Sequence, residues 1–269
     1  MSLPAKVPDV AVQEDETSVS LTPRRLIGWE IFVVFAVSLG ASGVRALVEL
    51  IGSLTAPQSL SKQQALLVGT LAPGRPWLDL ALQLVSLAQG LAPVALVWYL
   101  LARSGEGLSD IGADLSQPAR DGLRGAALAT LIGGTGLGLY LIAFHLGVSL
   151  NVVAESLPPV WWRIPVLILN AAQNGILEEI LVLGYLLRRL GQLGWSPWHA
   201  IVFSAVLRGS YHLYQGFGGF LGNAAMGLIF GYLYKRWGRV MPLIIAHTLI
   251  DTVAFVGYAL LHGHVSWLP

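Results

Sequence analysis

Long apolar runs separated by short polar connections constrain this chain more than any other feature. Of its 269 residues, 55% are hydrophobic and only 12% are charged, whereas soluble domains carry about 25% charged residues. A helix needs about 20 mostly apolar residues to cross the hydrocarbon core of a bilayer. The sequence therefore predicts an all-α, polytopic transmembrane helical bundle that sits in a lipid bilayer.

The apolar runs predict about seven membrane-spanning helices, or eight if a further segment enters the membrane. The expected spans are residues 26–48, 78–102, 122–146, 160–188, 197–214, 217–236 and 240–261. The run at 160–188 is longer than one span requires, so we expect it to be tilted or broken near 170–175. Residues 1–22 are polar and predict a disordered tail, followed by a single integral-membrane domain at 23–265.

The positions of Lys and Arg predict the orientation of the bundle. Basic clusters at 24–25, 188–189 and 235–239 fall on the same side when the expected spans are followed in order. Because cytoplasmic loops are enriched in Lys and Arg, we expect a cell-membrane protein with a cytoplasmic N-terminus and an outer C-terminus. The chain has no cysteine, which excludes disulfides and thiolate chemistry. It has no basic stripe or groove-reading motif, so we expect no nucleic-acid partner.

Ionisable side chains inside the late apolar runs are the candidate functional residues. Such groups are costly in a membrane, and their default interpretation is functional. The set comprises Glu178, Glu179, His212, His247 and Asp251, with Arg208 and Asn223 as supporting residues. At about 1.5 Å per residue, they lie at similar depth near the membrane midplane. A structural role, in which polar groups simply join helices, is the alternative, but an acid–base set at one depth favours a functional site.

The spacing within this set predicts which side chains share a face. Arg208 lies four residues before His212, so the two are expected on the same face of one helix. The same spacing relates His247 to Asp251. The adjacent glutamates point about 100° apart, so one can enter a site while the other supports it.

These motifs, EEILVLG at 178–184, RGSYH at 208–212 and HTLID at 247–251, resemble the CPBP family of intramembrane proteases. That family includes type II CAAX prenyl endopeptidases and bacterial bacteriocin-processing, Abi-like and self-immunity proteins. The resemblance covers about residues 160–261, the expected catalytic core. Two positions depart from the family pattern, because Leu183 stands in place of an Arg and Arg208 in place of a Phe. We therefore predict that Arg208 supplies a cation to Glu179 from the neighbouring helix.

The resemblance implies a glutamate-dependent endopeptidase that acts on a membrane-associated or lipidated peptide or protein. Glu178 would activate a water molecule held jointly with His212, and Glu179 would support it. His247, oriented by Asp251, would stabilise the oxyanion or protonate the leaving amine. No cofactor is firmly implied.

Other functions are compatible with the same residues. Glu178, His212 and His247 are an adequate ligand set for a divalent metal such as zinc, although no HExxH motif is present, and metal-free catalysis is the favoured interpretation. A catalytically inactive scaffold, chaperone or bacteriocin-immunity protein would keep the fold to bind a partner. A small transporter ranks last, because transporters usually carry repeats in both halves and these polar residues lie only in the second half.

Overall fold

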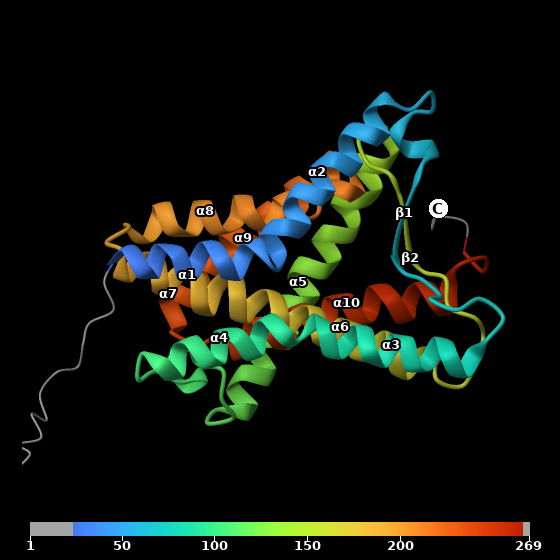
Figure 1. The fold of residues 1–269 in the computed structure, drawn as a ribbon. Helices are drawn as coiled ribbons and strands as arrows, with labels where there is room; N and C mark the ends of the chain where they lie inside the picture. Colours follow the sequence, from blue (N-terminus) through green and yellow to red (C-terminus); the bar gives the residue numbers. More distant parts are fainter. Residues whose placement is uncertain (1–23, 266–269) are drawn as a thin grey trace, which may run out of the picture.

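The computed structural model describes residues 24–265, and the tail expected at 1–22 lies outside this range. Most of the described chain is helical, and most helices run along one common direction (Figure 1). The helices are α1 (Arg24–Ala36), α2 (Leu39–Thr55), α3 (Pro76–Gly90), α4 (Ala92–Arg103), α5 (Pro118–His145), α6 (Arg163–Glu178), α7 (Leu186–Gln192), α8 (Pro197–Ser210), α9 (Phe217–Trp237) and α10 (Met241–Leu261). The predicted helical membrane bundle is therefore confirmed at the level of fold class.

The number of candidate membrane spans among the described residues is smaller than the number of spans expected from the sequence. Five stretches among residues 24–265 are long and apolar enough to cross a membrane, namely Pro76–Arg103, Pro118–His145, Arg163–Gln192, Phe217–Trp237 and Met241–Leu261. The α1–α2 pair, bent by 50°, makes a sixth if it counts as one broken span. The expected span at 197–214 is instead α8, whose 14 residues reach only about 21 Å, less than the hydrocarbon thickness. Seven or eight spans are thus not confirmed.

Proline and glycine set several helix boundaries. Proline occupies the first or second position of α3, α4, α5, α8 and α10, where its missing N–H costs no hydrogen bond. Pro93 also explains the break between α3 and α4, because its ring and missing N–H disfavour an unbroken helix through residues 90–92. Gly238 ends α9 in the left-handed conformation, with φ of 65°, and so allows the tight turn into α10.

The long run at 163–192 is broken, but later than the sequence suggested. α6 is regular through 170–175 and ends at Glu178, and the next turn, Glu179–Tyr185, is π-helical. A π-helical turn changes the direction of the following side chains and is frequent at functional sites. Ser204 of α8 donates a hydrogen bond to the Val182 carbonyl at 2.9 Å, so this irregular turn is tied to its neighbouring helix.

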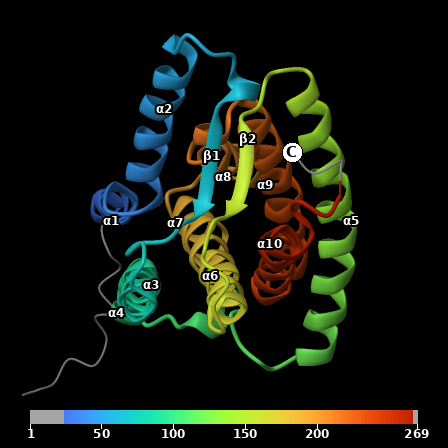
Figure 2. The same ribbon diagram turned by 90° about the vertical axis from the view of Figure 1, so that its right-hand side faces the viewer.

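A small parallel sheet was not predicted from the sequence. Strand β1 (Gln64–Val68) pairs with β2 (Asn151–Glu155) in the register Gln64 to Asn151. The strands come from two segments that the sequence placed in connections between spans, and they lie across one end of the bundle (Figure 2). An ion pair between the buried Glu155 and the partly buried Arg163 joins β2 to the start of α6.

Close packing brings together the helices that carry the predicted polar positions, α6, α8, α9 and α10. A Cβ added at Gly175 would lie 2.6 Å from Oγ1 of Thr248, and one added at Gly227 would lie 2.9 Å from Cα of Ala205. Small residues at such contacts let helix backbones approach in a membrane. α6 therefore packs directly on α10, and α8 on α9 (Figures 1 and 2).

Candidate active site

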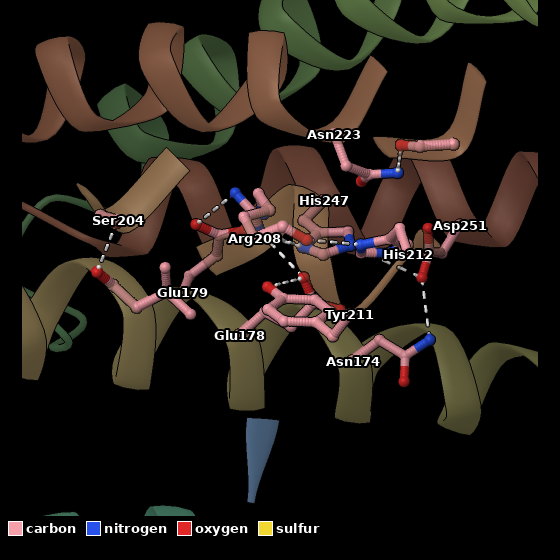
Figure 3. Close-up of polar contacts among 12 residues, drawn as sticks. Asn174, Glu178, Glu179, Ser204, Arg208, Tyr211, His212, Asn223, His247 and Asp251 are labelled. Atoms are coloured by element: carbon pink, nitrogen blue, oxygen red, sulfur yellow. Dashed lines mark hydrogen bonds and ion pairs between the residues drawn. The ribbon is translucent and has the colours of Figure 1, made fainter. Parts of the chain in front are cut away.

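The structure gathers most of the predicted site residues around one arginine (Figure 3). Glu178 ends α6 and Glu179 begins the π-helical turn. Arg208 lies on α8, and α10 supplies His247 and Asp251. Three separate parts of the chain therefore contribute ionisable groups to one cluster.

Arg208 is fully buried and contacts both glutamates. Its Nη2 forms a close ion pair with Oε1 of Glu179, and its Nη1 lies 3.4 Å from Oε2 of the same carboxylate. Nη2 also lies 3.2 Å from Oε2 of Glu178. The predicted contact between Arg208 and Glu179 is therefore confirmed. Leu183, at the position of the family arginine, is completely buried in the apolar core.

Glu178 is held through only one of its two oxygens. Its Oε2 accepts a hydrogen bond from the Tyr211 hydroxyl at 2.8 Å, in addition to the Arg208 contact. Within residues 24–265 no group donates to Oε1, and the side chain keeps 10% exposure. Tyr211 was not among the site residues predicted from the sequence, although its position three residues after Arg208 in the RGSYH motif was an available signal.

Apart from the ion pair between Arg208 and Glu179, the shortest contact of the site joins Glu179 to His247. His247 Nδ1 lies 2.7 Å from Oε1 of Glu179, whereas His247 Nε2 lies 3.7 Å from Oδ2 of Asp251. Asn174, one turn before Glu178 on α6, donates to the same Asp251 oxygen at 3.0 Å. The imidazole therefore lies between two carboxylates. The sequence predicted that Asp251 would orient this ring, but the closer partner of His247 is Glu179.

His212 follows α8 instead of lying on it. The helix ends at Ser210, so the shared helical face expected for Arg208 and His212 is replaced by a turn. His212 Nδ1 lies 3.0 Å from the Arg208 carbonyl oxygen. Because a carbonyl can only accept, Nδ1 carries the hydrogen of the neutral ring, and Nε2 is left as an acceptor.

Among the described residues, Asn223 is the predicted site residue that neither a hydrogen bond nor an ion pair joins to this cluster. It lies on α9 and donates to the carbonyl of Gly219 in its own helix, at 3.0 Å. This contact gives it a local role within the described chain.

The part of the chain that carries this cluster matches a known protein family. Residues 159–253 match the family model described as Type II CAAX prenyl endopeptidase Rce1-like. We call residues 159–253, which are similar to this family, the Rce1-like region. The match includes all five predicted site residues and confirms the resemblance to CPBP family proteases. No curated protein and no solved structure shows a significant match. Together with its long apolar helices, the match supports a multi-pass membrane protein.

The side chains of the Rce1-like region, as the structure arranges them, do not form a metal site. Within residues 24–265, no three His, Asp or Glu side chains are grouped so that they could hold a metal ion. In the alternative set of Glu178, His212 and His247, the guanidinium of Arg208 already contacts the Glu178 carboxylate. A metal cation placed there would be repelled by that positive charge. These residues therefore do not fit a three-ligand zinc centre.

Proposed function

We propose that the Rce1-like region is an intramembrane endopeptidase that hydrolyses a peptide bond with a water molecule activated by Glu178. The supporting observation is the asymmetric binding of this carboxylate. Tyr211 and Arg208 hold its Oε2, while Oε1 has no hydrogen-bond partner in the described chain. A carboxylate anchored in this way keeps one oxygen with which to take a proton from water.

The open acceptor of His212 complements Glu178 in this proposal. The attacking water donates one hydrogen to Glu178 Oε1 and the other to His212 Nε2, and its oxygen attacks the scissile carbonyl carbon. Glu178 takes the proton from the water and later transfers it to the leaving amine as the C–N bond breaks. His247, whose Nδ1 is held by Glu179 at 2.7 Å, presents its Nε2–H to the developing oxyanion.

The substrate class follows from the position of these groups. The glutamates lie within the apolar stretch Arg163–Gln192 and His247 lies within Met241–Leu261. A substrate must therefore enter the bilayer or lie against it, which favours a membrane protein or a lipidated peptide. We place the basic ends of α7 and α9 in the cytoplasm, together with the N-terminus, because Lys and Arg favour that side.

One observation favours a second candidate, an inactive scaffold or immunity protein. Arg208 contacts Glu178 as well as Glu179, so its charge opposes proton uptake by the proposed base. In addition, Leu183 occupies the position at which the family has an arginine. In this role the polar cluster would only hold α6, α8 and α10 together.

Substitution of Glu178 separates the two functions. Membranes from cells expressing wild type, Glu178→Gln or Glu49→Gln at equal levels are compared for peptide termini by mass spectrometry. Glu49 is the matched control, because it is an exposed glutamate that pairs with Arg45 on α2. The peptidase proposal expects termini that are present with wild type and Glu49→Gln and vanish with Glu178→Gln. Identical termini in all three samples, with the proteins folded, would overturn it and favour the scaffold.

A further inference from the structure

Four arginines line a hollow where the start of α5 meets the end of α9. The hollow has a volume of about 330 Å³, and its lining residues are Gln117, Arg120, Arg124, Arg236, Trp237 and Arg239. The apolar stretch of α5 begins at Pro118 and that of α9 ends at Trp237. The hollow therefore lies at the boundary of two spans, at the depth of lipid headgroups.

Arg239 is already neutralised by acidic neighbours. It donates to Asp121 Oδ2 at 2.7 Å and to Asp114 Oδ1 at 3.0 Å. Hydrogen bonds from Arg239 hold the pKa of the Asp114 carboxyl well below its usual range, as expected for a strong pair. Arg239 thus joins the loop before α5 to the turn between α9 and α10, and its charge is not available to a ligand.

The other three arginines have no such neutralisation. Within residues 24–265, neither Arg120, Arg124 nor Arg236 forms an ion pair with a carboxylate. Nη1 of Arg120 donates a hydrogen bond to Oε1 of Gln117 at 3.1 Å, which orients the guanidinium group. Arg124 lies over the ring of Trp237, with its guanidinium carbon 4.4 Å from the ring centre. These contacts position two cations without cancelling their charge.

We propose that this hollow binds the phosphate of an anionic phospholipid headgroup. Guanidinium groups bind phosphate oxygens in a bidentate fashion, and basic pockets between spanning helices recognise lipid headgroups. Its volume is within the range of small-ligand pockets. Trp237 is suited to this depth, since tryptophan is enriched at the membrane–water interface. The site is separate from the Glu178 cluster and does not depend on the proposed peptidase activity.

Lipid retention measured by native mass spectrometry tests this site. The purified protein is titrated in detergent with phosphatidylglycerol, with phosphatidylcholine, and with inorganic phosphate. The pocket variant carries Arg124→Gln and Arg236→Gln, and the control carries Arg24→Gln and Arg25→Gln, which remove the same charge from the start of α1. We expect phosphatidylglycerol affinity to fall about fivefold for each pocket arginine, or about 25-fold in all, and to stay near the wild-type value in the control.

Several outcomes would overturn the proposal. Equal losses in both variants would show that the attraction is a diffuse effect of net charge. Equal retention of phosphatidylcholine would show that the hollow does not select an anion. Full competition by inorganic phosphate would assign the hollow to a soluble anion instead of a lipid. If the double variant does not fold, Arg236→Gln alone carries the test, because no hydrogen bond of this side chain within the described residues is lost, and a fivefold decrease is then expected.

Discussion

Replacing Arg208 by glutamine tests whether this guanidinium makes the burial of two carboxylates tolerable. Arg208 and Glu179 have completely buried side chains, and Glu178 is only 10% exposed. In the Arg208→Gln variant, Glu179 would keep His247 as its remaining charged partner. Removing one member of a buried ion pair typically costs about 3–5 kcal/mol. For a chain of this size, that corresponds to a melting temperature about 6–20 °C lower.

Thermal unfolding in detergent measures this effect, and a second variant identifies its cause. Arg208→Gln combined with Glu179→Gln removes both members of the pair, so the doubly substituted protein should melt higher than Arg208→Gln alone. The control is Arg45→Gln, which breaks an ion pair whose arginine side chain is 82% exposed and should change the melting temperature little. A melting temperature of Arg208→Gln equal to that of the control would contradict the stabilising role of Arg208. That role is also contradicted if the two substitutions at the site are simply additive.

Three further predictions concern other contacts. Combining Leu183→Arg with Arg208→Phe restores the family arrangement and should retain any peptidase activity, measured by mass spectrometry of peptide termini. Arg208→Phe alone should abolish that activity. Unchanged activity in Arg208→Phe would contradict the role assigned to Arg208. Ser204→Ala removes the donor to the buried Val182 carbonyl and should lower the unfolding free energy by about 1–3 kcal/mol, as denaturation in mixed micelles would show; wild-type stability would mean that this bond contributes nothing. The pKa of Asp114 is lowered in the folded protein, so its stabilisation is present above its unfolded pKa of about 3.9 and declines as the pH falls below that value. Between pH 5 and pH 3, the melting temperature of wild type should therefore fall further than that of Asp114→Asn. Equal decreases in the two proteins would contradict this link between the Asp114 charge and stability.

The membrane class, several helix boundaries and the members of the ionisable cluster can be deduced from the amino-acid sequence alone. Apolar runs must become helices in a bilayer, because every backbone polar group has to be paired there. Pro118, Pro197 and Gly238 act locally, so their effect on helix ends can be deduced without knowing the fold. The glutamates and His247 were recognisable because ionisable groups are rare in apolar runs.

The contacts among these residues, in contrast, depend on how the helices pack together. The π-helical turn after Glu178 depends on packing against α8, whose Ser204 binds the turn. The choice of Glu179 over Asp251 as the closer partner of His247 depends on ångström-scale differences in how α6 meets α10.

The same holds for the elements that the sequence did not reveal. β1 pairs with a strand more than 80 residues away, and α8 stops at Ser210, which frees Tyr211 to reach Glu178. Hydropathy and local propensity report the environment of a segment. Hydropathy and propensity do not indicate which distant segment will pack against a given segment. In this bundle the pairing of helices depends on close packing at small residues such as Gly175 and Gly227.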